Sequence, residues 1–455
     1  MNEYIVKEKD KTGKIFLNKE AIDSESLKQV KSMIRHEAIH NARVMPDCHK
    51  SMGCCVGFTS KIIDKIVPNF VGGDIGCGIT TYPLSDFNES KLKQFDKFIR
   101  NIVPFNFQSV LYGKPTDYLS DTFFDDALDR IYHLSNIEVS EFIKLYKEEL
   151  CVDISELKPI YDKEWFELLA KKVKSSDIEI KGGLGTLGGG NHFIEINKSL
   201  HNEQKYLTVH SGSRALGKKI CEYHQSIIKK GREFDFKYFD SETKEFNKTT
   251  KNKKERQRFQ NELREKLDTN KHPLYLMDEE AVNYYFDMIF AQKYAVVNRE
   301  LMISNSIRYL DLVFDPELKI ESIHNYIDFT DFIMRKGAIN AHKGKECIIA
   351  LNMKDGILLC EGLGNEDWNY SSAHGAGRII TRTKAINNCI SMEKKMKAQL
   401  EEANVYTSSD LKYIVDEAPD CYKETDLIKE TIGNSVIIKE QLVPILNIKS
   451  GIKTD

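Results

Sequence analysis

The sequence lacks the segments that carry a protein into or across a membrane. No uninterrupted apolar run approaches the roughly 20 residues of a transmembrane helix, and Met1–Lys7 has no apolar signal core. The formal net charge is only −3, so no whole-chain basic field indicates nucleic acid, although a local basic groove is compatible with that total. We therefore expect a cytoplasmic protein with no membrane partner.

A disulfide framework, an internal repeat, a low-complexity tract and a flexible linker are also missing. Ten cysteines in 455 residues are too sparse for a disulfide scaffold. Cys77 is considered separately below. We expect the other nine to be reduced thiols, largely buried as small hydrophobic side chains: Cys48, Cys54, Cys55, Cys151, Cys221, Cys347, Cys360, Cys389 and Cys421.

Glycine-rich segments with short apolar runs alternate with helical patterns along the whole chain. Residues 45–79, 182–196 and 206–217 are of the first kind, and we expect buried strands at 54–58 and 69–73. The segment Ser24–Arg35 is amphipathic, with Ser24 as an expected N-cap. The alternation predicts one large mixed α/β unit over residues 1–455, with helical insertions at about 86–176 and 225–275.

Two helical patterns allow more than one interpretation. Lys244–Lys266 is rich in lysine and arginine, and an exposed helix with paired charges is favoured over a flap that contacts RNA. Asp278–Ile303 carries Tyr284, Tyr285 and Tyr294 with other apolar residues, and these aromatic side chains are expected in the core rather than in a stacking platform.

Several potential metal ligands stand in loop-like settings. Asp74 and Cys77 flank a glycine turn, and both side chains could reach one ion. His192 follows a glycine run, His210 ends an apolar strand, and His324 is a third such histidine. Each alone is more often a structural residue. Together they suffice for two neighbouring divalent cations, and a donor set of thiolate, carboxylate and imidazole suits zinc or manganese.

The segment Ser372–Arg378 has little to bury and several groups that could contact a phosphate. Gly375 and Gly377 allow backbone N–H groups to approach an anion, and Arg378 adds a forked cationic donor. Walker and Rossmann signatures are missing, and Lys354-Asp355-Gly356 lacks the spacing of a nucleotidyl-transfer lysine. His374 is therefore the candidate nucleophile for any nucleotidyl transfer.

The motifs, taken in order, resemble those of RtcB-type RNA ligases over roughly residues 40 to 450. The combination is specific even though each piece is not. The motifs are Met45-Pro46-Asp47-x-His49, Gly73-Asp74-Ile75-Gly76-Cys77-Gly78, Gly190-Asn191-His192-Phe193-x-Glu195, His210-Ser211-Gly212-Ser213-Arg214, His324-Asn325, Arg335-Lys336-Gly337-Ala338, His374-Gly375-Ala376-Gly377-Arg378, Glu417-Ala418-Pro419-x-x-Tyr422-Lys423 and Lys449.

This resemblance implies a compact α/β enzyme that joins an RNA 3′-phosphate or 2′,3′-cyclic phosphate to a 5′-hydroxyl, in RNA repair or tRNA splicing. It implies GTP as cofactor, a guanylylated His374 and two Mn²⁺ ions. By position, Asp47 resembles a residue that orients His374. The implied metal ligands are Asp74, Cys77, His192, His210 and His324. The implied guanylate contacts are Asn191, His192, Phe193, Ile194, Glu195, His324, Asn325, Asn352, His374, Gly375, Ala376, Gly377, Arg378, Tyr422 and Lys449.

The chain departs from the family pattern at three places, which indicates a divergent branch. Ala350-Leu351-Asn352-Met353 replaces Pro-Gly-Ser-Met, Ser372 replaces a cysteine, and Lys50-Ser51-Met52 replaces a more glycine-rich run. Nucleotide affinity or choice is therefore open, as are the physiological RNA, the oligomeric state and any activating partner.

Two other functions compete with the ligase. A metal-dependent phosphoesterase would open cyclic phosphates without joining ends, with His374 serving only to bind phosphate. A non-catalytic RNA-binding module would use the metal ligands structurally. The retained Glu195, Arg378 and Lys449 argue against the latter, because a structural metal site needs no guanylate pocket.

Overall fold

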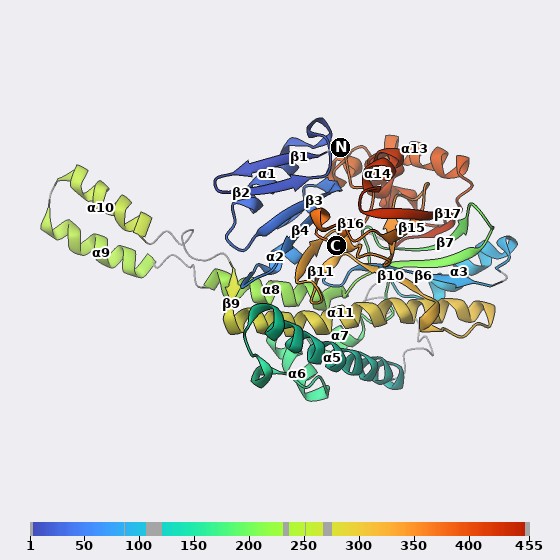
Figure 1. The fold of residues 1–455 in the computed structure, drawn as a ribbon, viewed down its shortest axis with the longest axis horizontal. Helices are drawn as coiled ribbons and strands as arrows, with labels where there is room; N and C mark the ends of the chain where they lie inside the picture. Colours follow the sequence, from blue (N-terminus) through green and yellow to red (C-terminus); the bar gives the residue numbers. More distant parts are fainter. Residues whose placement is uncertain are drawn as a thin grey trace.

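Two antiparallel-rich sheets form the centre of the protein in a computed structural model that describes residues 3–85, 87–105, 121–230, 236–250, 252–266 and 275–450. The strand orders are β1-β2-β3-β4-β12-β11 and β10-β6-β8-β7-β17-β15-β14, and β2 pairs with β3 in parallel. With helices around these sheets, the fold is mixed α/β, as the alternation of motifs predicts (Figure 1).

The strands of the first sheet are β1 (Tyr4–Glu8), β2 (Lys11–Ile15), β3 (His40–His49), β4 (Val56–Lys61), β12 (Ile333–Lys336) and β11 (Asn325–Asp328). The second sheet contains β10 (Ile320–Ile323), β6 (Gly78–Leu84), β8 (Lys205–Ser211), β7 (Phe193–Ser199), β17 (Val436–Ile448), β15 (Ile357–Gly362) and β14 (Glu346–Ala350). Two short pairs complete the described strands: β13 (Ala338–Asn340) with β16 (Ser371–Ala373), and β5 (Lys65–Ile66) with β9 (Leu276–Met277).

The helices fall into three groups along the chain. The first group is α1 (Ser24–Ile34), α2 (Pro68–Val71), α3 (Leu92–Ile102), α5 (Asp121–Leu150), α6 (Lys163–Lys172) and α7 (Asp177–Lys181). The second is α8 (Arg214–Lys230), α9 (Phe236–Thr249), α10 (Lys253–Lys266) and α11 (Asp278–Ile307). The third is α12 (Arg382–Asn387), α13 (Cys389–Glu402) and α14 (Thr425–Ile432). None of the helices in the described ranges is long and apolar enough to cross a membrane.

Helix α11 is buried on nearly all sides and forms the spine of the molecule. It packs against α5, α8 and the second sheet (Figure 1). Tyr284, Tyr285 and Tyr294 are all fully buried, so the expectation that they belong to the core is confirmed. The phenyl rings of Phe142 on α5 and Phe329 meet beside Tyr285, and the apolar area removed from water here is the main stabilising contribution of this region.

Two local expectations from the sequence are wrong. Asp23, and not Ser24, is the N-cap of α1, because the Asp23 carboxylate accepts a hydrogen bond from the Ser26 backbone N–H at 2.8 Å. Residues 69–73 begin within helix α2 rather than in a strand. Pro68 stands at the first helical position, where its fixed φ angle favours a helical turn.

The predicted insertions are largely helical where the structure describes them. Residues 106–120 of the first insertion, and residues 231–235, 251 and 267–274 of the second, lie outside the described part. The charged stretch Lys244–Lys266 contains two helices, α9 and α10, which project from the rest of the protein in Figure 1. Lys248 pairs with Glu245 and Arg258 with Glu262, in agreement with exposed helices that carry paired charges.

All ten cysteines are free, and eight of them are buried, as expected from their sparse distribution. Cys151 is exposed and Cys389 is half-buried.

The buried side chain of Arg299 fixes two loops to the α11 spine. Its guanidinium donates to the carbonyls of Gly76 at 2.9 Å and Ser211 at 2.8 Å, which adjoin Cys77 and His210. It also forms an ion pair with Glu321 at 2.9 Å. Because Arg299 is completely buried, these bonds are shielded from water and hold the two loops in one position.

We predict that Arg299→Met lowers the free energy of unfolding by about 3 to 5 kcal/mol, because it leaves Glu321 and two buried carbonyls without a main partner. Denaturant titration measures the change. Arg258→Met is the control, because Arg258 is exposed on α10, and its replacement should change stability by less than about 0.5 kcal/mol. Equal stability of the two variants would contradict the role assigned to Arg299.

Candidate active site

One cavity of about 920 Å³ is lined by most of the residues that the sequence analysis singled out, but not by Asp47, His192 or Ile194. They stand at the ends of strands, where the backbone leaves a sheet and side chains become accessible. The residues that line the cavity from strand ends are His49 on β3, Cys77 before β6, Phe193 on β7, His210 on β8, His324 between β10 and β11, and His374 after β16.

The five predicted metal ligands lie together. The Cys77 Sγ atom is 3.5 Å from His192 Nε2 and 3.4 Å from His210 Nε2. His210 Nε2 is 3.3 Å from His324 Nε2, and His192 Nε2 is 3.0 Å from an Asp74 carboxylate oxygen. Residues more than 240 positions apart in the chain therefore present their donor atoms to one small volume.

The donor atoms form two groups that share Cys77. One group is Cys77, His210 and His324, and the other is Asp74, Cys77 and His192. Within each group all donor atoms lie within 4.8 Å of one another, which suits a single divalent cation. The shared thiol could bridge two ions.

Burial favours a cation at two of the histidine donors but disfavours ionisation of the Cys77 thiol. It holds the pKa of His210 and His324 well below the usual value, and neighbouring histidines lower it further, so both rings are neutral. His192 Nδ1 donates to the Leu187 carbonyl at 2.8 Å, which leaves its Nε2 lone pair for an ion. Burial and the Asp74 charge raise the pKa of the Cys77 thiol, a cost that a bound cation would offset.

His374 lies beside this cluster and is held by Asp47. Its Nδ1 is 2.6 Å from the Asp47 Oδ2 atom, and its ring centroid is 4.6 Å from that of His324. The same carboxylate oxygen accepts the backbone N–H groups of His374 at 3.2 Å and Gly375 at 3.3 Å. Nδ1 is thus engaged by a fully buried carboxylate, which leaves Nε2 as the ring nitrogen without that partner.

Gly377 allows this close approach of two loops. Its φ angle is +74°, and a Cβ atom there would lie 2.1 Å from the Asp47 carbonyl oxygen. Any other residue at 377 would push the His374 loop away from Asp47.

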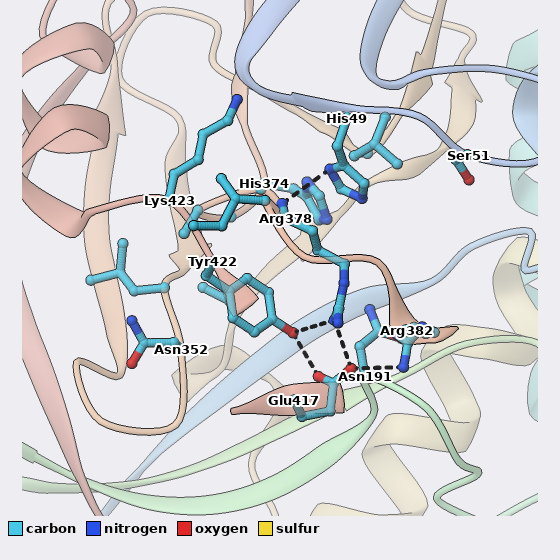
Figure 2. Close-up of a pocket in the computed structure, with 18 of the residues that line it drawn as sticks. His49, Ser51, Asn191, Asn352, His374, Arg378, Arg382, Glu417, Tyr422 and Lys423 are labelled. Carbon is cyan, nitrogen blue, oxygen red and sulfur yellow. Dashed lines mark hydrogen bonds and ion pairs between the residues drawn. The ribbon is translucent and has the colours of Figure 1, made fainter. Parts of the chain in front are cut away.

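A buried carboxylate, Glu417, organises the opposite wall. It binds Arg378 at 3.1 Å and Arg382 at 2.8 Å, and it accepts the Tyr422 hydroxyl at 2.7 Å (Figure 2). It also binds Lys449 at 3.3 Å. Burial alone would raise the pKa of Glu417, but the three surrounding cations outweigh it and hold the pKa well below its usual value. The Asp416 carboxylate also pairs with Arg382, so the wall has three cations against two carboxylates and favours an anionic ligand.

Strand β7 supplies a further face of the cavity. Asn191, Phe193 and Glu195 line it, and Lys449 Nζ lies 5.5 Å from the Phe193 ring centroid. Ile194 does not line the cavity, because alternate side chains of a strand point to opposite faces, and it packs in the hydrophobic core instead.

Burial raises the pKa of Glu195 to about 7, although hydrogen bonds from Asn197 and Asn447 oppose the shift. This carboxyl group can therefore change its charge near neutral pH.

The loop at residues 350–353 borders the cavity, as the resemblance implies. The side-chain amide of Asn352, however, forms hydrogen bonds within the turn of residues 352–355. Its side-chain oxygen accepts the backbone N–H groups of Lys354 and Asp355, and its amide donates to the Asp355 carboxylate at 2.8 Å. Ser372, at the other departure, is buried and hydrogen-bonded to Ser435 at 2.8 Å.

Sequence reasoning assigned no role to several residues of the site. Lys336 and Arg382 line the cavity, and Lys423 donates from a buried position to the carbonyls of Pro46 at 2.7 Å and Cys48 at 2.9 Å. Lys336 and Lys423 stand inside the quoted motifs, which was the available signal. No pattern in the sequence singled out Arg382.

Comparison with known proteins gives one family. The family model described as tRNA-splicing ligase RtcB matches residues 29–450. The chain is 28% identical over 417 residues to RNA-splicing ligase RtcB of Escherichia coli K12, covering 85% of this chain and 84% of the relative. It is 24% identical over 451 residues to tRNA-splicing ligase RtcB of Methanococcus maripaludis, covering 86% and 84%.

We predict that Cys77→Ala weakens Mn²⁺ binding at least about tenfold, because it removes the ligand that both donor groups share. Electron paramagnetic resonance of free Mn²⁺ during titration measures the affinity without any enzymatic assay. Cys151→Ala is the matched control, because Cys151 is exposed and takes no part in the cluster. Unchanged affinity in Cys77→Ala would contradict the assigned metal site.

Proposed function

Because the chain belongs to the RtcB family, we propose that it is an RNA ligase that joins 3′-phosphate or 2′,3′-cyclic phosphate ends to 5′-hydroxyl ends. GTP is its cofactor, and His374 carries GMP during the reaction. We further propose that residues 1–455 act as one ligase domain with two helical insertions, in RNA repair or tRNA splicing.

One observation carries the proposal. His374, oriented by Asp47, faces the same cavity as the histidine and cysteine cluster, with its ring 4.6 Å from that of His324. A phosphoryl group beside both would meet an imidazole nitrogen and a set of candidate metal ligands at once. The cationic wall around Arg378 would bind the charged oxygens of the nucleotide.

The first step forms a bond between His374 Nε2 and the α-phosphorus of GTP, and pyrophosphate leaves. The imidazole gains positive charge, which the buried Asp47 carboxylate stabilises through Nδ1. An oxygen of the RNA 3′-phosphate then attacks the phosphorus, the bond to nitrogen breaks, and GMP passes to the RNA end. Attack by a 5′-hydroxyl on the 3′-phosphorus finally joins the strands and releases GMP.

The residues present fit the family's manganese. Asp74, Cys77, His192, His210 and His324 would hold two ions, because three imidazoles, a thiol and a carboxylate converge there. When bound, Mn²⁺ supplies neutralisation of phosphate oxygens and of charge on the leaving group. The protein's own contribution is to position the reacting groups.

The guanine base is proposed to bind on the face formed by Phe193, Glu195 and Lys449. An ionised carboxylate at Glu195 can accept guanine N–H groups, and Lys449 can donate to a guanine carbonyl. Since Asn352 uses its polar atoms within its own turn, base recognition falls mainly to Glu195 and Lys449.

The test of the proposal is the intact mass of the protein after incubation with GTP and Mn²⁺. We expect a covalent GMP adduct on the parent chain and none on His374→Ala, because the bond from the His374 imidazole nitrogen to phosphorus cannot form without that ring. His342→Ala serves as the control, because His342 is partly exposed outside this cavity and should leave the adduct intact.

Absence of the adduct in the parent chain would contradict the ligase proposal. Opening of a cyclic phosphate without GTP and without joining would then favour the phosphoesterase.

We predict that GTP binds more weakly as the pH falls through about 7, because Glu195 becomes protonated and can no longer accept two guanine N–H groups. Glu195→Gln should bind GTP about tenfold more weakly at pH 8 and show little dependence on pH. Equilibrium binding with a fluorescent GTP analogue measures both. An unchanged pH dependence in Glu195→Gln would assign the titration to another group.

A further inference from the structure

A second imidazole, that of His49, faces the cavity without belonging to the metal cluster. It lies at the end of β3, two residues after Asp47. Its Nδ1 atom is 3.0 Å from the Asp47 backbone carbonyl. Asp47 therefore orients two rings: its carboxylate holds His374, and its carbonyl holds His49.

The hydrogen bonds at Nδ1 determine what the other nitrogen can do. Two contacts compete for His49 Nδ1: the Arg378 backbone N–H at 3.4 Å needs a lone pair there, and the Asp47 carbonyl at 3.0 Å needs a proton. We assign the proton to Nδ1 because the contact to the carbonyl is the shorter one. The Nε2 atom then carries a lone pair directed away from β3. No hydrogen-bond partner of this nitrogen is found among the residues that the structure describes.

The surroundings keep the ring neutral. Burial lowers the pKa of His49 to about 4, with Asp47 opposing this effect and His374 and Lys423 adding to it. Asp47 belongs to β3 itself, His374 to the loop after β16, and Lys423 to the segment after Pro419. Arg378 approaches His49 only through its backbone N–H. At neutral pH, His49 is thus available to accept a proton.

His49 stands away from the part of the cavity assigned to guanylate. Figure 2 shows His49 and Ser51 toward one end, and Asn352, Tyr422 and Glu417 toward the other, with His374 near His49. In phosphoryl transfer the attacking and leaving oxygens lie roughly in line on opposite sides of phosphorus. With GMP as the leaving group at the guanylate end, the nucleophile enters from the side of His49.

We propose that His49 is the general base for the joining step, an inference that rests on the proposed function. Its Nε2 takes the proton of the RNA 5′-hydroxyl as the hydroxyl oxygen forms its bond to the 3′-phosphorus. The bond from that phosphorus to the GMP oxygen breaks, and GMP leaves. The imidazolium then returns the proton to water.

The inference separates the steps of the reaction. Formation of His374–GMP needs no base at His49, because the attacking atom of that step is an imidazole nitrogen and no hydroxyl proton has to be removed. Asparagine at position 49 can place an N–H near the position of Nδ1 and keep the bond to the Asp47 carbonyl, but it offers no base toward the cavity. His49→Asn therefore removes the proposed chemistry while retaining the contact that orients the loop.

We expect His49→Asn to form the GMP adduct within about threefold of the parent rate but to join strands about 10²- to 10⁴-fold more slowly. Joining is measured in a single turnover with RNA whose 3′-phosphate already carries GMP and with a 5′-hydroxyl strand. His342→Asn is the control and should join at the parent rate, since His342 lies outside this cavity.

A strand with a 5′-thiol in place of the 5′-hydroxyl separates base catalysis from positioning. A thiol ionises near neutral pH and needs little help from a base, so the defect of His49→Asn should shrink at least tenfold with that strand. An equal defect with both strands, joining at the parent rate, or an adduct lost in parallel with joining would overturn the role of His49. If the parent chain forms no adduct at all, it is the proposed function that fails.

Discussion

The arrangement of the cavity depends on the buried carboxylate of Asp47. One of its oxygens accepts three hydrogen bonds, from the His374 ring and from the backbone N–H groups of His374 and Gly375. The buried Lys423 ammonium fixes the strand that carries Asp47, because it donates to the carbonyls of the two neighbouring residues, Pro46 and Cys48. A buried carboxylate is stable only with such partners, so loss of any one of them would loosen the nucleophile loop as a whole.

The metal cluster depends on a different anchor, the α11 spine. Arg299 binds the carbonyls of Gly76 and Ser211, and through them sets the positions of Cys77 and His210. His324 is added by its own backbone, whose N–H donates to the Cys77 carbonyl at 2.9 Å. Two independent supports, Asp47 for His374 and Arg299 for Cys77 and His210, thus meet at the contact between His374 and His324.

The sequence could predict which residues gather at the site better than it could predict how the fold orients them. Histidines in glycine-rich surroundings mark strand ends, and this pattern pointed to His192, His210, His324 and His374, which the structure brings together. It could not place Ile194, because the facing direction of a strand residue depends on its neighbours in the sheet.

Local chemistry overrode the sequence pattern elsewhere. Pro68 starts helix α2, so residues that were expected in a strand begin within a helix. Asp23, rather than the expected Ser24, is the N-cap of α1. Asn352 borders the cavity, but its side-chain amide is hydrogen-bonded to Lys354 and Asp355 of its own turn. Lys423 acts through backbone carbonyls of β3, a contact between segments 375 residues or more apart that no local pattern contains.

The two imidazoles bound to Asp47 differ in the charge of their partner, and this difference suits two kinds of chemistry. His374 donates to a carboxylate, which stabilises a positive ring, as required of an imidazole that carries a phosphoryl group. His49 donates to a neutral carbonyl in buried surroundings, which do little to stabilise a positive ring. A proton taken by His49 would therefore be released readily, whereas a group bound to His374 would persist until an acceptor arrives. In the proposed mechanism, one aspartate would thus set a lasting carrier beside a transient base, since its side chain and its backbone present different charges.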